Sequence, residues 1–292
     1  MANNSATVPR IFDSRVYALH RARAAHRGGE SFLEAEVAEN LSERLGAVKR
    51  RFAHALDLTS RDSAFQVLQG HAAHWTRSVV ATEEDALPFA NGTFDLVTSV
   101  LSLHALNDLP GALSEIRRVL MPDGLFLAAL FGGGTLGELR RAFAAGESET
   151  IGGVSPRVAP FADVRDLGGL LQRAGFALPV ADVERIDVAY AEFTTLVNDL
   201  RALGETNVLA ERSRKFLRRD TLAATLSQYS VADADESGRL RATFDVLYLT
   251  AWAPHDSQPK PLSPGSAKTR LADALGTHEK SAGEPTLFLR KP

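Results

Sequence analysis

The chain has 292 residues, 24% charged residues and a formal net charge of −3, which describes an ordinary globular protein without the basic excess typical of nucleic-acid binding. It contains no cysteine, which excludes disulfides, thiolate catalysis and cysteine-ligated metal or iron–sulfur sites. Its apolar runs are far shorter than the ~20 residues of a membrane-spanning helix, so we expect no transmembrane segment.

Residues 1–50 are expected to form N-terminal cap helices. The apolar periodicity predicts one helix over Phe12 to Ala25 and a second over Glu30 to Leu45. Five arginines and one acid, Asp13, lie in the first 27 residues. A mitochondrial presequence has a similar composition, but we favour a basic helix beside the mouth of an active site. No apolar signal region follows, so we expect a cytoplasmic protein, or a mitochondrial matrix protein in a eukaryote.

A buried strand is predicted over Phe52 to Leu58, and Asp57 lies near its carboxyl end. The next five residues, Thr59 to Ser63, form a turn whose hydroxyl groups are expected to cap the following helix. That helix is predicted over Ala64 to Trp75, with a short strand over Ser78 to Ala81.

Strand, helix, turn and strand signals follow one another without a gap between Glu83 and Gly134. An Asn-Gly turn leads into an apolar strand over Phe94 to Val100, an amphipathic helix begins near Asp108, and a second strand covers Leu125 to Phe131. Two apolar strands joined by such a helix predict a βαβ unit in a parallel sheet.

The loop that ends in His104 leaves the carboxyl end of the first of these strands, where open α/β sheets bind ligands. His104 is therefore our candidate for a proton acceptor or a polar anchor for substrate. The alternative is a loop histidine that bonds only to backbone.

Glycines 132–134 at the next strand end allow a close backbone approach to a ligand, and Thr135 is a candidate cap for a helix over Leu136 to Ala145. The segment from Gly152 to Arg157 is expected to face the same cleft. Arg157 is suited to binding a carboxylate, with a surface salt bridge as its alternative.

The remaining elements complete a single domain. They are a helix over Asp163 to Ala174, a strand over Val180 to Val188, a helical lid at about residues 190–235, an antiparallel edge strand over Leu240 to Trp252, and an extended tail over 254–292 with at most a short helix at Leu271 to Leu275. Lid residues Asn198, Arg201, Glu205 and Asn207 are candidates for substrate selection.

Several long strings resemble a known family. LPFANGTFDLV, NDLPGAL and RRVLMPDGLF resemble class I S-adenosylmethionine-dependent methyltransferases of the malonyl carrier-protein type. FGGGTLGELR, GGVSPRVAPFADVRDLGGLLQRAGF and WAPHDSQPKPLSPGSA are similar to the methyltransferase-like assembly factor of respiratory complex I and its bacterial relatives. The resemblance implies an α/β, Rossmann-like class I methyltransferase fold over 51–253, with a mostly parallel sheet and a helical lid.

The resemblance also implies a cofactor and a substrate side. S-adenosylmethionine is the implied cofactor, and a respiratory complex I subunit or another protein is the implied partner. The implied cofactor-binding residues are Asp57, Thr59, Ser63, Glu83, Glu84, Asp85, Ser99 and Ser102. The implied substrate-binding residues are His104, Ser155 and Arg157.

Two departures from the family pattern weaken the cofactor expectation. The glycines that would let the backbone approach the cofactor at positions 59, 61 and 63 are absent, and Arg61 is the most disruptive replacement. Only 25 residues separate Asp57 from Glu83, where about 35 to 45 would be typical for the elements expected there. We therefore predict a sheet shortened by one βα unit, the one whose strand ends in the acid that binds ribose.

Two functions remain open at this stage. The first is a methyltransferase, or a related hydroxylase, that acts on a protein side chain; the second is a cofactor-free protein with the same fold that serves as an assembly or interaction factor. A nicotinamide oxidoreductase would need a glycine fingerprint that the turn after Asp57 does not contain. His71 and His74 lack a third ligand in the sequence, so we predict no metal site.

Overall fold

The computed structural model describes residues 9–28, 31–79, 86–259, 266 and 269–278. The contacts within the chain divide it into two units, residues 1–255 and 256–292. In the second unit, the short helix α9 covers Leu271–Leu275. None of the helices in the described ranges combines the length and apolar character needed to cross a bilayer.

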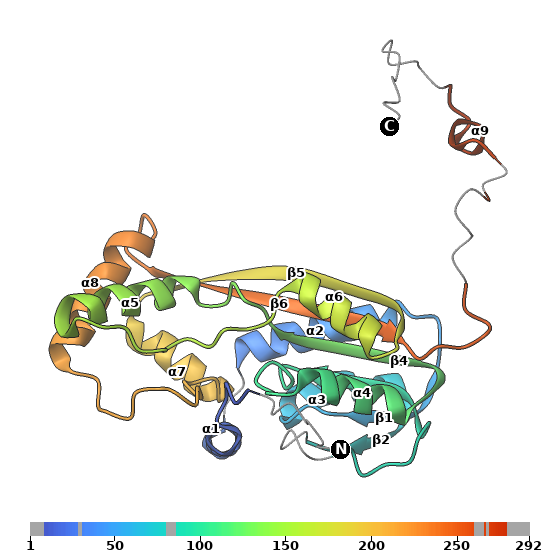
Figure 1. The fold of residues 1–292 in the computed structure, drawn as a ribbon, viewed down its shortest axis with the longest axis horizontal. Coiled ribbons are helices and arrows are strands. Elements are labelled where there is room, and N and C mark those ends of the chain that lie inside the picture. The colour runs from blue at the N-terminus through green and yellow to red at the C-terminus, as the bar shows by residue number, and fades with distance from the viewer. Residues whose placement is uncertain (1–8, 29–30, 80–85, 260–265, 267–268, 279–292) are drawn as a thin grey trace, which may run out of the picture. The chain divides into compact units, whose positions relative to one another are not determined.

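A six-stranded sheet in the order β2-β1-β3-β4-β6-β5 forms the centre of the first unit (Figure 1). The first four of these strands run parallel, and β6 is antiparallel to both of its neighbours. The strands are β1 (Phe52–Asp57), β2 (Ala72–Arg77), β3 (Phe94–Val100), β4 (Leu120–Phe131), β5 (Ala177–Tyr190) and β6 (Leu240–Trp252). The predicted α/β fold with a mostly parallel sheet is confirmed.

Helices pack on both faces of this sheet because its strands alternate apolar side chains between two cores. Leu96 of β3 lies in the core shared with α2 (Phe32–Gly46) and α3 (Asp62–Leu68). Its neighbour Val97 lies in the core shared with α4 (Leu109–Val119) and α6 (Val164–Arg173).

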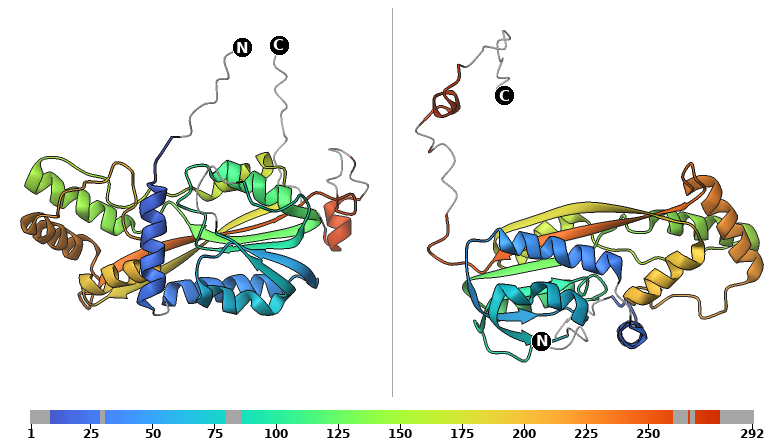
Figure 2. Two further views of the ribbon diagram at one scale, coloured as in Figure 1. Left: turned by 90° about the horizontal axis from the view of Figure 1, so that it is seen from below. Right: turned by 180° about the vertical axis from the view of Figure 1, so that it is seen from behind.

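A group of helices surrounds the long ribbon formed by β5 and β6, at the left of Figure 1. These are α5 (Gly137–Ile151), α7 (Phe193–Leu203) and α8 (Arg219–Asp233), and the last two lie between β5 and β6, in the span where a helical lid was expected. Helices α5 and α8 pack tightly, since a Cβ added at Gly146 would lie 2.5 Å from Thr225 Oγ1. Helix α1 (Ser14–Arg27) contacts α7 (Figure 2).

The elements between β1 and β3 differ from the prediction. The predicted helix ends at Leu68, a 3₁₀ turn with Gly70 follows, and the strand occupies 72–77 instead of 78–81. Residues 78 and 79 are outside any helix or strand, and 80–81 lie outside the described residues. Trp75 belongs to the strand because its ring packs edge-on against Phe65, with centroids 5.4 Å apart.

The missing unit also lies elsewhere than predicted. The strand beside β1 is present, but it ends in Arg77 and not in an acid. No helix or strand covers residues 78–79 and 86–93, the described part of the connection to β3. The shortening therefore falls after β2, and its consequence at the sheet edge is a cation in place of the expected carboxylate.

Three further local predictions were wrong. Strand β6 is not an edge strand, because β5 pairs along its outer side and β6 is mostly buried. The N-cap of α3 is Arg61, with no side-chain cap, and the Thr59 hydroxyl of the preceding turn bonds to Asp57 and Val100 instead. The N-cap of α5 is Leu136, while Thr135 Oγ1 bonds to the backbone of Asp245 in β6.

Candidate functional site

The carboxyl end of β1 is bound by its own neighbours. Asp57 is fully buried, and its Oδ1 accepts hydrogen bonds from Thr59 Oγ1 at 2.6 Å and Thr98 Oγ1 at 3.0 Å. Burial raises the pKa of Asp57, although Thr59, Thr98 and Arg77 oppose that shift. The Asp57 carboxylate thus already accepts hydrogen bonds from neighbouring side chains at this end of the sheet.

The turn after β1 is tied to the end of β3. Thr59 Oγ1 accepts from the backbone N–H of Val100 at 3.1 Å, and Ser102 Oγ accepts from the N–H of Ser60 at 3.3 Å. Hydrogen bonds between the β1 turn and the end of β3 therefore already engage three of the predicted cofactor-binding residues, Asp57, Thr59 and Ser102. Ser99 is fully buried on β3, and its hydroxyl has no hydrogen-bond partner in the described part of the chain.

Arg61 is packed into the protein at the position where the family pattern places a glycine. Its side chain is 8% exposed, its Nε lies 2.7 Å from Glu34 Oε2 of α2, and its guanidinium also donates to the carbonyl of Ala202. Glu34 is 1% exposed, and it also accepts from Ser63 Oγ at 3.5 Å. Arg61 thus joins the β1 turn to α2 and to the lid helix α7.

A second arginine occupies the end of β2. Arg77 Nε lies 3.4 Å from Asp57 Oδ2, and the guanidinium also pairs with Asp62 and donates to the carbonyl of Thr59 at 3.3 Å. Dinucleotide folds place a ribose-binding acid at this strand end. The predicted adenine contacts, Glu83, Glu84 and Asp85, lie outside the described residues.

These residues do not fit S-adenosylmethionine as they stand. A methionine and ribose moiety needs a close backbone approach and a carboxylate for the sugar hydroxyls. Here the turn carries a buried arginine side chain, and the second strand ends in another arginine. Both cations are already paired with acids of the same region.

His104 lies beyond β3 in a buried polar cluster. Its Nε2 is 3.0 Å from Glu205 Oε2, and Glu205 Oε1 accepts from both Tyr17 Oη and Arg21 at 3.0 Å. Arg21 also donates to Ser102 Oγ at 3.1 Å, so the cluster is continuous with the β1 turn. Burial tends to raise the pKa of Glu205, but His104, Arg21 and Tyr17 together hold it below its usual value.

Two phenylalanines fix the orientation of the His104 ring. Phe131 lies with its centroid 4.9 Å away, and Phe161 is edge-on at 5.1 Å. The side chain is fully buried, and Nδ1 has no hydrogen-bond partner within the described ranges. His104 therefore contacts a carboxylate side chain, that of Glu205, and is not the backbone-bonded loop histidine of the alternative reading.

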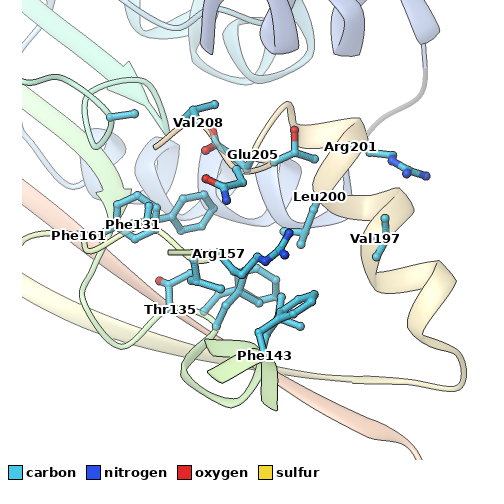
Figure 3. A pocket seen from close by; sticks show the side chains of 18 of the residues that line it. Phe131, Thr135, Phe143, Arg157, Phe161, Val197, Leu200, Arg201, Glu205 and Val208 are labelled. Carbon is cyan, nitrogen blue, oxygen red and sulfur yellow. The ribbon is translucent and has the colours of Figure 1, made fainter. Parts of the chain in front are cut away.

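An apolar cavity of about 380 Å³ adjoins this cluster, a size typical of small-ligand pockets. Its walls include five phenylalanines and the carboxylate-bearing residue Glu205. Figure 3 shows Phe131 and Phe161 near Glu205, with Arg157 and Phe143 lower in the view. The cofactor candidates at 57–63, 99 and 102 are not part of this wall.

Arg157 lines the cavity, but its charge is already neutralised. Its Nε lies 2.8 Å from Oε1 of Glu147, which is fully buried in α5. Ser155 binds the same carboxylate through its backbone N–H at 2.6 Å and its hydroxyl at 2.7 Å. Burial tends to raise the pKa of Glu147, yet Ser155 and Arg157 hold it below its usual value. The two substrate candidates thus both bind the carboxylate of Glu147, and of the two, Arg157 is the one that lines this cavity.

Several residues of these networks carried no functional prediction, among them Tyr17, Glu34 and Glu147. Glu34 stands between apolar positions on the inner face of α2, next to buried Leu33 and close to buried Val37. An acid at such a position is a sequence signal for a buried ion pair, because a carboxylate is rarely buried without a partner. The identity of that partner is visible only in the folded chain.

Comparisons with known proteins identify the family. A family model described as "Methyltransferase domain" matches residues 35–128. The human mitochondrial arginine-hydroxylase NDUFAF5 is 39% identical over 263 residues, covering 83% of this chain and 76% of that protein. The Danio rerio protein of the same name is 44% identical over 194 residues, covering 66% of this chain and 60% of its own length.

The malonyl-[acyl-carrier protein] O-methyltransferase of Halorhodospira halophila is 35% identical over 244 residues, or 75% of this chain and 81% of that one. Both resemblances seen in the sequence are thereby confirmed. The chain belongs to the family of the arginine-hydroxylase NDUFAF5 proteins and carries a methyltransferase domain.

Proposed function

We propose that this protein acts in the assembly of respiratory complex I by recognising a protein side chain, and that it does so without S-adenosylmethionine. The first part rests on family membership, since relatives that cover most of this chain are named arginine-hydroxylases. The second part rests on one observation, the Arg61–Glu34 ion pair at the place where the cofactor's backbone cradle would lie.

The ion pair supports the cofactor-free proposal because separating Arg61 from Glu34 costs free energy. Both side chains are at least nine-tenths buried, and separating them would leave a charge in the interior without a partner. Breaking a buried pair typically costs about 3–5 kcal/mol. A cofactor would have to supply this free energy before gaining any net affinity.

Calorimetric titration with S-adenosylmethionine tests this part directly. We expect no binding heat at millimolar cofactor for the natural protein. The variant Arg61→Gly with Glu34→Gln removes both charges and restores a glycine, so it is the matched test of whether the pair blocks the site. Micromolar binding by the natural protein would overturn the cofactor-free proposal.

The complex I role needs a separate measurement. Deleting the gene in its native host should lower the amount of assembled complex I on native gels, and a tagged copy should co-purify with a complex I subunit. Such a role places the protein where the complex assembles, in the matrix of a mitochondrion or in the cytoplasm of a bacterium. Normal complex I levels in the deletion strain would contradict it.

His104 is the side chain we propose as the proton acceptor of the site, acting through Glu205, because the His104 ring is fully buried and Glu205 lines the cavity. Its ring is held by Glu205 and by two phenylalanines, which gives the fixed geometry that proton transfer requires. Complementation of the deletion strain with His104→Gln should fail, whereas the natural gene should restore complex I. Full rescue by the variant would remove His104 from the proposal.

A second candidate function, S-adenosylmethionine-dependent methyl transfer, has specific support. The methyltransferase domain match spans the β1 turn, and the buried hydroxyls of Ser60 and Ser99 lack partners in the described part of the chain. Such hydroxyls are free to bond a ligand. The same titration separates the two candidates, because this one requires cofactor binding by the natural protein.

A further inference from the structure

Helices α1 and α7 enclose a hollow with an unusual concentration of positive charge. It has a volume of about 300 Å³ and is lined by His20, Arg23 and Arg27 of α1 and by Arg201 and Thr206 at the end of α7. We call this group the arginine rim.

The arginines of the rim are not neutralised by acids. Within the described ranges, no carboxylate lies within ion-pair distance of Arg23, Arg27 or Arg201, and Arg201 donates only to Asn198 Oδ1 at 3.4 Å. The nearby carboxylate of Glu205 is already shared by three partners. A group of guanidinium ions without acids is a ready binding site for phosphate or carboxylate.

The positive charges around the rim also affect the pKa of His20. Burial lowers the pKa of His20, and the charges of Arg23 and Arg212 lower it further, against weaker opposing effects of Glu205 and Thr206. His20 Nδ1 lies 2.8 Å from Thr206 Oγ1. The histidine therefore adds a polar contact to the rim and little positive charge.

The rim borders the apolar cavity. Arg201 and Thr206 line both the hollow and the cavity, so the two spaces meet at these side chains. Figure 3 shows the Arg201 guanidinium on the outer side of α7, away from the phenylalanines. The wall of the cavity itself is apolar apart from a few groups, and its charged members other than Arg201, namely Arg157 and Glu205, are paired.

From this juxtaposition we infer that the protein binds an amphipathic anion, with its apolar body in the cavity and a carboxylate or phosphate head on Arg23, Arg27 and Arg201. The inference goes beyond the proposed function and does not depend on it. It names a ligand class that the cavity and rim select together: the phenylalanines accept a chain or a ring, and the arginines accept one negative head.

Octyl phosphate and octanoate are suitable probes, with octanol as the neutral analogue and inorganic phosphate as the isolated head. Calorimetry should show one site per chain for both anions, with octanol and inorganic phosphate each binding at least tenfold more weakly. The two anions together tell whether the rim prefers phosphate or carboxylate. Binding should weaken as salt is added, because the rim is exposed.

Three variants locate the site. Arg23→Ala with Arg201→Ala should weaken octyl phosphate at least tenfold and leave octanol unchanged. Arg165→Ala is the matched control, because Arg165 is exposed on α6 and lines neither space. Val197→Trp should fill the cavity and weaken both the anions and octanol.

Several outcomes would overturn the inference. These are equal binding of octanol and octyl phosphate, inorganic phosphate binding as tightly as octyl phosphate, or unchanged binding by the double arginine variant. Sedimentation with anionic phospholipid vesicles in the absence of octyl phosphate binding would also overturn it, and would make the rim a membrane-surface patch.

Discussion

Replacing Arg61 by methionine should destabilise the protein strongly, because it leaves Glu34 as a buried carboxylate without its ion-pair partner. Glu34 is 1% exposed and Arg61 is 8% exposed, so solvent cannot substitute for the lost contact. Removing one member of a buried pair typically costs about 3–5 kcal/mol, whereas replacing both by apolar residues is often neutral or stabilising. We therefore expect Arg61→Met to lose about 3–5 kcal/mol and Arg61→Met with Glu34→Met to recover most of it.

The pH dependence provides an independent check. Burial raises the pKa of Glu34 above its usual 4.5, and Arg61 and Arg21 oppose that rise. Without Arg61 the pKa rises further, so the folded state holds a proton that the unfolded chain has released. Stability then falls as the pH rises above about 4.5. The loss caused by Arg61→Met should be small below that pH and should grow through neutral pH.

Urea unfolding of the natural protein, the two single variants and the double variant gives the coupling energy between Arg61 and Glu34. Equal unfolding midpoints for Arg61→Met and the natural protein at pH 7 would refute the reasoning. A loss that shrinks with rising pH would refute the assigned sign of the pKa shift.

Three further changes test other parts of the structure. Glu205→Gln should cost about 3–5 kcal/mol at pH 7, because it leaves the buried guanidinium of Arg21 without its anion. The difference in urea midpoints should vanish as the pH falls through the lowered pKa of the natural carboxylate. Glu147→Gln should cost about 1–3 kcal/mol and expose Arg157 to trypsin, whereas unchanged proteolysis would show that the pair does not hold its loop. Gly146→Ala should destabilise the protein by about 1–3 kcal/mol and so lower its melting temperature, since the new Cβ would lie 2.6 Å from a backbone nitrogen of α8. Gly168→Ala in α6, with no atom within 4 Å, is its control and should raise it slightly.

The sequence predicted the sheet and most helices because their signals are local. The apolar run from Phe94 to Val100 and the amphipathic helix after Asp108 depend only on neighbouring residues, and both appear as predicted. Strand β2 was missed because it is half-exposed and short, so its six residues carry no clear alternation. The position of β6 inside the sheet was missed because strand order depends on where the chain crosses over, which no local pattern records.

The candidate site was harder to predict, since its contacts join residues far apart in the chain. Arg21 and Glu205 are separated by 184 positions, yet they share a hydrogen bond at 3.0 Å. The sequence did point to Arg61 as an obstacle to cofactor binding, because a glycine was expected there. The sequence could not show that the Arg61 guanidinium forms an ion pair with Glu34. In the folded protein Arg61 is therefore a structural contact as well as an obstacle to the cofactor.

Buried acids of this protein are paired with arginines, and this pairing limits which ligands the cavity can bind. Glu34, Glu147 and Glu205 are buried acids of these networks, and each has an arginine partner in the described part of the chain. A cationic guest would enter without an anion free to receive it, and an unpaired charge in the interior costs several kcal/mol. An anionic guest avoids this cost if its head stays outside, on the arginine rim. The cavity therefore selects by shape and apolar character, and the rim selects by charge.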